Sequence, residues 1–154
     1  MDSIVEIRAL QPEDSADMWR IRNHEMVRCM SHDTSSIPRA VHDAWFARYI
    51  ANPENRAFVL VCDSRVAGYC RIDHGLVSIA IDPEFQGRGF SRQLLTESIL
   101  RVRDTTSRIL AEVRRDNPIS LGLFTAAGFG IIEEDGEKYI LAFPSPSLDS
   151  SVEP

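Results

Sequence analysis

Hydrophobic and polar side chains recur along the first third of the chain with two different periods. Residues 4–10 alternate apolar and polar positions, which predicts a strand. A helical pattern begins at Pro12, where a proline and two acidic residues suit a first turn, and runs to about Arg22. A second amphipathic helix is predicted from roughly Pro38 to Ile50. The expected inner face of that helix consists of Val41, Ala44, Trp45, Arg48 and Tyr49.

The middle of the chain is dominated by strand patterns. Three of them follow in quick succession, at Ala57–Cys62, Val66–Ile72 and Leu76–Ile81, and their short polar connections predict an antiparallel meander. A helix is expected next, over Phe90–Arg103. Its predicted buried residues are Leu94, Leu95, Ile99 and Val102.

The last third predicts a strand, a short helix and a hairpin. The strand is Ile109–Val113, and the helix runs from Pro118 to Ala127 and stops at Gly128, a C-terminal glycine cap. Phe129–Glu134 and Lys138–Phe143 form the hairpin. We expect one domain over residues 1–143 and a loose tail, rich in Ser, Pro and Asp, over residues 144–154.

Composition narrows the class of protein. The length of 154 residues with 44% hydrophobic and 26% charged residues is typical of one globular domain. A net charge of −6 argues against a nucleic-acid partner, because polyanions are bound by basic patches. The sequence has no N-terminal apolar signal and no long apolar run. Nothing in it therefore indicates secretion or a membrane span. The three cysteines lack metal-ligand spacing, so we expect no metal. Their number is odd, and a reducing cytoplasm fits them best, so we expect a cytoplasmic protein.

A glycine-bearing turn between a strand and a helix, residues 79–95, is the most informative segment. Gly87 and Gly89 allow the main chain to approach a ligand closely, and the following helix adds unpaired N–H groups, which together predict a phosphate-binding loop. No lysine follows either glycine, which excludes a P-loop. Arg92 stands where a dinucleotide fingerprint needs a third glycine, which excludes that motif as well.

Two motifs and the order of elements resemble the GNAT family of N-acetyltransferases. Gln86-x-x-Gly89-x-Ser91 resembles the family's pyrophosphate loop, Gln/Arg-x-x-Gly-x-Gly/Ala. The segment from Asn117 to Phe129 resembles its second signature, Asn-x-x-(Ala/Ser)-x-x-(Leu/Phe)-Tyr-x-x-x-Gly-Phe. The predicted order β-α-α-β-β-β-α-β-α-β-β is also that of the family. The resemblance implies an α+β, three-layer α/β/α fold with a mixed, mostly antiparallel sheet that splays between strands four and five.

The resemblance also implies acetyl-CoA as the co-substrate. Its pantetheine arm would lie along the fourth strand, and its pyrophosphate on the N–H groups of the glycine loop. The implied cofactor-binding residues are Ile79, Ala80, Ile81, Gln86, Gly87, Arg88, Gly89, Phe90, Ser91, Asn117 and Phe124. Three of these positions have ordinary structural alternatives: Ile79 and Ile81 are also expected in the core, and Asn117 is equally well placed as a helix N-cap.

Four residues are candidates for the acid–base chemistry of acetyl transfer. Glu112 projects from the fifth strand away from the apolar layer, so it could bind an ammonium group and accept its proton, although a surface ion pair is the commoner role. His74, beside Asp73 in a turn, is a second base, although turn histidines are usually just solvated. Phe124 fills the family's tyrosine position, so Ser120, Tyr139 or water would protonate the thiolate, unless it leaves unassisted.

The segment Arg22-Asn23-His24-Glu25 and the later His42-x-x-Trp45-Phe46 resemble the opening of enzymes that acetylate the 4-amino group of UDP-linked amino sugars in the pseudaminic-acid pathway. This implies Arg22 and His42 near the nucleotide and Met30 near the sugar, although all three are also ordinary helix-surface or core residues. Protein N-terminal acetylation, of the ribosomal-protein type, and aminoglycoside acetylation remain alternatives. A non-catalytic acyl-CoA sensor is a fourth reading, and a homodimer is possible.

Overall fold

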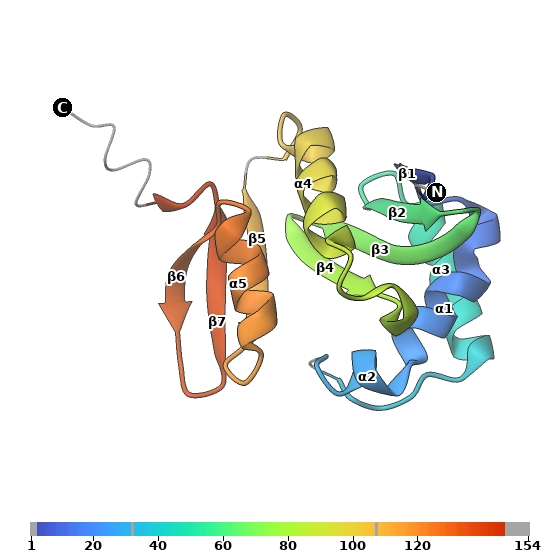
Figure 1. The fold of residues 1–154 in the computed structure, drawn as a ribbon, viewed down its shortest axis with the longest axis horizontal. Helices are drawn as coiled ribbons and strands as arrows, with labels where there is room; N and C mark the ends of the chain where they lie inside the picture. Colours follow the sequence, from blue (N-terminus) through green and yellow to red (C-terminus); the bar gives the residue numbers. More distant parts are fainter. Residues whose placement is uncertain (1–2, 32, 107, 147–154) are drawn as a thin grey trace.

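Seven strands form a single mixed sheet in the order β1-β2-β3-β4-β5-β7-β6. The computed structural model describes residues 3–31, 33–106 and 108–146. The strands are β1 (Val5–Ala9), β2 (Arg56–Cys62), β3 (Arg65–Asp73), β4 (Leu76–Ile81), β5 (Ile109–Arg114), β6 (Gly130–Glu134) and β7 (Lys138–Phe143). Helices cover both faces of this sheet (Figure 1), which confirms the predicted α/β/α layering.

The helices divide between the two faces. They are α1 (Ser15–Asn23), α2 (Glu25–Arg28), α3 (Arg39–Ala51), α4 (Phe90–Val102) and α5 (Pro118–Ala126), with short 3₁₀ turns η1 (Pro12–Asp14) and η2 (Pro83–Phe85). Helices α1 and α3 pack on one face through Met18, Ile21 and Phe46. Helices α4 and α5 pack on the other. We call these the α1/α3 face and the α4/α5 face.

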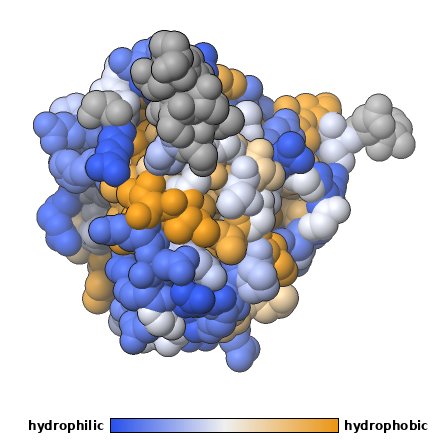
Figure 2. Space-filling view, turned by 90° about the vertical axis from the view of Figure 1, so that its left-hand side faces the viewer, coloured by the Kyte–Doolittle hydropathy of each residue, from blue (hydrophilic) through white to orange (hydrophobic). Residues whose placement is uncertain are grey.

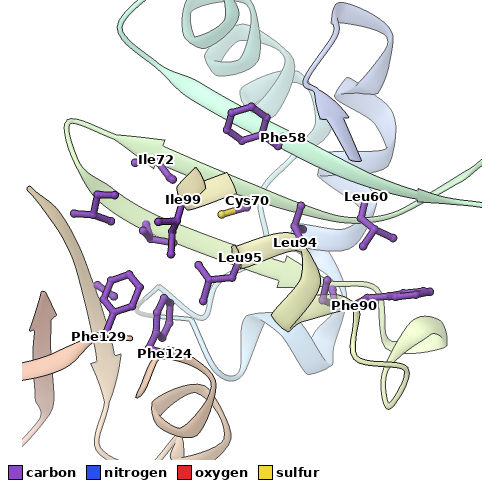
Figure 3. Packing of buried hydrophobic residues seen from close by; sticks show 14 of the residues in the cluster. Phe58, Leu60, Cys70, Ile72, Phe90, Leu94, Leu95, Ile99, Phe124 and Phe129 are labelled. Carbon is purple, nitrogen blue, oxygen red and sulfur yellow. The ribbon is translucent and has the colours of Figure 1, made fainter. Parts of the chain in front are cut away.

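The α4/α5 face contains the larger of the two hydrophobic cores. Leu94, Leu95 and Ile99 of α4 lie over the sheet, and Phe124 and Phe129 extend the same cluster to the β5 side (Figure 3). The four predicted core residues of α4 are all buried, as are Cys62 and Cys70. One continuous core therefore joins the two halves of the sheet on this face.

Strands β4 and β5 form the one parallel pair of the sheet, and it is short. Only Leu76 with Leu110 and Val77 with Ala111 are in register, after which the strands separate. All other neighbouring strands pair antiparallel over most of their length. The gap between β4 and β5 in Figure 1 is the predicted splay, which is confirmed. We call the space between the separated strands the wedge.

Two details of the helices differ from the prediction. The short helix α2 was not expected, and it forms because His24 caps it through a hydrogen bond of 3.1 Å from the Met26 N–H to Nδ1. The predicted inner face of α3 was right for Tyr49, which is buried, but wrong for Val41, which is 58% exposed, and it omitted the buried His42 and Phe46. The helix has apolar residues on more than one side, so the pattern alone could not choose the face that packs.

The C-terminal tail and the homodimer both stay predictions. Within the region predicted as a tail, the Ser145 N–H donates to the Gly128 carbonyl at 2.9 Å, and residues 147–154 lie outside the described residues. Figure 2 shows the face nearest the edge strand β6, where hydrophilic surface surrounds a small apolar area. Ile131 on that strand is 44% exposed, and the homodimer stays a prediction.

The described ranges contain neither a membrane-spanning helix nor a metal-ligand cluster. No helix within them is long and apolar enough to span a membrane. No group of three or more His, Cys, Asp or Glu residues among them has a metal-binding arrangement.

His42 is a fully buried titratable residue at the contact between α1 and α3. Its Nε2 lies 3.0 Å from the Ser15 carbonyl, and Nδ1 has no hydrogen-bond partner among the described residues. Its ring also packs against Trp45 and Phe46, with centroids 5.7 and 5.8 Å away. Burial, as the largest cause, lowers the pKa of His42 below its usual 6.5. The fold therefore favours the neutral imidazole.

This burial predicts a specific pH dependence of stability. Below pH 6.5 the unfolded chain binds a proton at His42 that the folded chain resists, so the free energy of unfolding should fall as pH falls, by at most about 1.4 kcal/mol per pH unit. In His42→Gln this component is absent. Urea unfolding of both proteins between pH 7.5 and 5.5 measures the difference, and parallel pH profiles would contradict the prediction.

Candidate active site

The glycine loop between η2 and α4 has the backbone conformation that the sequence predicted. Gly87 and Gly89 have φ angles of +79° and +77°, in the left-handed region that favours glycine. Gly89 is also the N-cap of α4. A Cβ added at either glycine would meet no atom within 4 Å, so the space beside the loop is open.

The main-chain donors of this loop face no protein acceptor. Among the described residues, the N–H groups of residues 87–92 make no hydrogen bond, whereas the next N–H, of Gln93, bonds to the Gly89 carbonyl at 3.1 Å. A row of unpaired N–H groups at the positive end of a helix is a preferred site for an anion. A shallow cavity of about 300 Å³, lined in part by Arg92 and Thr96, adjoins it. The loop therefore fits a diphosphate.

The wedge supplies a second set of unpaired backbone groups next to the loop. The Gly75 carbonyl accepts a hydrogen bond from the Leu110 N–H at 2.7 Å, so this carbonyl points toward β5. Because backbone groups alternate in direction along a strand, those of Ile79 and Ile81 point the same way. At that level β5 has moved away, and these groups line the wedge. An extended, amide-containing ligand could pair with them as a strand would.

Glu112 lies where the wedge begins, on the α1/α3 face. It is the first residue of β5 after the last register pair, Val77 with Ala111. Its Oε1 forms an ion pair with Lys138 of β7, while Oε2 has no partner among the described residues. The Glu112 side chain is 29% exposed. One carboxylate oxygen is therefore held by the protein, and the other is free to accept a proton or a hydrogen bond.

The candidates for thiolate protonation lie on the α4/α5 face of the sheet. Asn117 caps α5, since its Oδ1 accepts the Ser120 N–H at 3.1 Å, so the N-cap role is realised. Phe124 is 3% exposed and packs edge-on against Phe129. Tyr139 packs against this core, with Arg115 4.8 Å from its ring centroid. Glu112 and these residues thus lie on opposite faces of the sheet.

His74 lies apart from the other candidates. It is an exposed residue with a φ of +51° in the turn between β3 and β4, at the end where β4 and β5 are paired. The neighbouring Asp73 accepts hydrogen bonds from Tyr49 Oη and Arg71, so it is engaged in a structural network. The fold does not bring His74 together with Glu112.

Arg22 of α1 is a partly buried cation that packs on an aromatic ring. Its guanidinium lies 5.0 Å from the centroid of the Trp45 ring, and Arg71 lies 5.2 Å from the same centroid. Arg71 pairs with Asp73, but Arg22 makes no hydrogen bond or ion pair with another described residue. Burial is the largest cause that lowers the pKa of Arg22. This cation on the α1/α3 face has donors to spare for an anion.

The other two predicted acceptor residues differ from each other. His42 is completely buried behind Trp45, so it supports that ring instead of presenting itself at the surface. Met30 is 41% exposed and lies in the segment after α2. Arg114 of β5 donates to the Cys29 and Ser31 carbonyls at 2.9 and 3.2 Å, so it holds this segment against the β5 side of the molecule.

Sequence reasoning missed Lys138, Arg71 and Arg114, which organise the α1/α3 face. Each is a charged residue on a strand that makes a contact with another element, in addition to any ion pair with a residue nearby in the sequence. Finding them requires the strand register, such as Arg114 opposite Lys138. Alternation along a single strand places them on a face but does not indicate what they contact.

Comparisons with known proteins agree with this geometry. The model of the acetyltransferase (GNAT) family matches residues 17–129. The N-alpha-acetyltransferase RimI of Mycobacterium tuberculosis is 31% identical over 100 residues, which cover 56% of this chain. The matched region spans 62% of the length of that relative.

Two solved structures share the fold over most of their length. A phosphinothricin acetyltransferase from Sinorhizobium meliloti in complex with acetyl-CoA has a TM-score of 0.78 at 19% identity, covering 92% of this chain and 88% of that one. Spermidine N-acetyltransferase from Vibrio cholerae with CoA and spermine has a TM-score of 0.74 at 18% identity, covering 90% and 92%. At such identities the likeness establishes the fold alone. With the family model matching most of the chain, the protein belongs to the acetyltransferase (GNAT) family.

Proposed function

We propose that this chain is an acetyl-CoA-dependent N-acetyltransferase that acts on a primary amine, and that the amine belongs to a nucleotide-linked amino sugar. The observation that carries the first part is the row of unpaired N–H groups at residues 87–92 beside the wedge. Acetyl-CoA combines a diphosphate with an amide-containing arm. Those are the two chemistries that the loop and the separated strands accommodate.

The chain supplies a different group for each requirement of the transfer. Acetyl-CoA provides the activated acetyl group, whose carbon forms a bond to the amine nitrogen while the carbon–sulfur bond breaks. Oε2 of Glu112, free of protein partners, accepts the proton that the nitrogen loses, directly or through water. On the opposite face, Ser120 or Tyr139 is the residue available to return a proton to the thiolate. Phe124 has no proton to give.

Arg22 supports the proposal for a nucleotide-linked acceptor. A guanidinium has a planar fork of donors that suits phosphate oxygens, and burying those donors without a partner is costly. Arg22 is only partly accessible, is stacked on Trp45 and forms no ion pair among the described residues, while the charge of Asp33 acts on it from a greater distance. A phosphate of the acceptor would satisfy it. We propose that Met30 adjoins the sugar. We propose that His42 acts indirectly, because it packs against Trp45, the ring on which Arg22 lies.

Protein N-terminal acetylation is a second candidate, because the RimI relative is an N-alpha-acetyltransferase. The two candidates differ in the group that accompanies the amine. A peptide N-terminus brings carbonyl oxygens that could accept from Arg22, but it brings no phosphate to neutralise the charge of that guanidinium.

A thermal-shift and thiol-release panel tests the proposed function. We expect acetyl-CoA to raise the melting temperature, a UDP-linked 4-amino sugar to raise it further, and CoA to be released only when both are present. Release with N-terminal peptides but not with the sugar would favour the second candidate. Stabilisation by acetyl-CoA with no thiol released by any amine would instead indicate an acyl-CoA sensor.

Glu112→Gln tests the proposed base. The change keeps the shape of the side chain but removes its ability to take a proton, so turnover should fall at least about tenfold while acetyl-CoA affinity changes little. Steady-state kinetics and calorimetric titration measure the two quantities. Unchanged turnover would remove Glu112 from the mechanism, and a matching loss of affinity would give it a role in binding instead.

A further inference from the structure

An ion pair between the exposed Arg20 and the buried Asp82 links α1 to the start of the glycine loop. Arg20 of α1 pairs through one terminal nitrogen with Oδ2 of Asp82, the residue that follows β4. The second terminal nitrogen of Arg20 donates to the Val66 carbonyl at 3.1 Å. Asp82 is only 3% exposed. The pair therefore joins residues 62 positions apart in the sequence, at the end of β4 that borders the open side of the wedge.

Every polar group of Asp82 is engaged in holding the turn that leads into the loop. Its N–H donates to the Ala67 carbonyl at 2.8 Å, and its carbonyl accepts the Phe85 N–H at 2.8 Å. Its Oδ1 caps η2 by accepting the Glu84 N–H at 3.0 Å. Only Oδ2 is left for Arg20. The orientation of η2, and of the loop that starts immediately after it, thus depends on where Asp82 is held.

Arg20 also has an electrostatic role, which is to neutralise the charge of Asp82. A carboxylate close to a diphosphate site weakens anion binding unless a cation neutralises it. Burial, the largest influence, raises the pKa of Asp82, but the Glu84 N–H and Arg20 together outweigh burial, so the pKa of Asp82 lies below its usual value. Asp82 is therefore charged at neutral pH, and Arg20 is the cation that faces it most closely.

We propose that Arg20 is a positioning residue for the cofactor: through Asp82 it holds the turn η2 in the orientation that directs the N–H groups of residues 87–92 at the diphosphate of CoA. This role rests on the proposed function. Arg20 itself does not touch the cofactor. Because α1 also carries Arg22, the same helix serves both the acceptor wall and the cofactor loop.

Two other ion pairs of the chain provide matched controls. Arg65 pairs with Glu84 of the same turn η2, at 2.9 Å, but both side chains are well exposed, at 60% and 67%. Arg8 pairs with Asp14 at 2.8 Å, and that carboxylate is as buried as Asp82, but it lies beside β1, at the far edge of the sheet. The Arg65–Glu84 pair controls for the loss of any ion pair close to the loop. The Arg8–Asp14 pair controls for the loss of an ion pair with a buried carboxylate elsewhere in the fold.

The test is calorimetric titration of the purified full chain with CoA, together with melting temperatures of each variant. Arg20→Met should weaken CoA binding about tenfold, because small misplacements of preorganised groups are costly. Arg65→Met and Arg8→Met should bind CoA as the wild type does, although Arg8→Met should melt at a lower temperature. In kinetics, Arg20→Met should raise KM for acetyl-CoA more than it lowers kcat.

Arg20→Lys carries the test if Arg20→Met does not fold. Lysine keeps the charge and has three N–H donors, but it lacks the planar fork that reaches Asp82 and the Val66 carbonyl through separate nitrogens, so CoA affinity should fall by a smaller factor, about threefold. A folded Arg20 variant with wild-type affinity for CoA would overturn the proposal, as would an equal loss of affinity in Arg8→Met. Failure of the wild type itself to bind CoA would overturn the proposed function, and this role with it.

Discussion

The parting of β4 from β5 after two paired residues is the constraint on which the rest of the structure depends. Buried backbone N–H and C=O groups need partners, and a strand that loses its neighbour leaves a row of them exposed. Here that row meets the unpaired N–H groups at the start of α4. The separation persists because α4 and α5 fill the α4/α5 face with one continuous core, which holds the two halves of the sheet together behind the wedge.

The residues proposed for the reaction lie on both faces of the sheet beside the wedge. Glu112, Arg22 and Trp45 lie on the α1/α3 face, where an acceptor would approach, and Ser120, Phe124 and Tyr139 lie on the α4/α5 face. The acetyl-bearing end of the co-substrate would sit between them. Charged residues that the reaction does not need directly, such as Lys138 and Arg114, tie the elements bordering the α1/α3 face to one another. Substrate choice can therefore vary on one face while the cofactor site is kept.

Most of the fold and the cofactor loop could be predicted from the sequence, because both depend on local rules. Alternation placed Ile79 and Glu112 on their correct faces, and glycine spacing located the loop. Long-range partners could not be predicted in this way. The ion pairs of Glu112 with Lys138 and of Arg20 with Asp82 depend on register and on how α1 docks. Helix α3 was misjudged because its apolar residues allow more than one buried face.

Backbone amide spectra of the ¹⁵N-labelled protein during titration with CoA test the central claim most directly. If the unpaired N–H groups hold the diphosphate and the separated strands hold the arm, the amides of residues 87–92 and of Ile79 and Ile81 should show the largest, saturable shifts. Saturable binding that leaves these amides unchanged and shifts others would contradict the account.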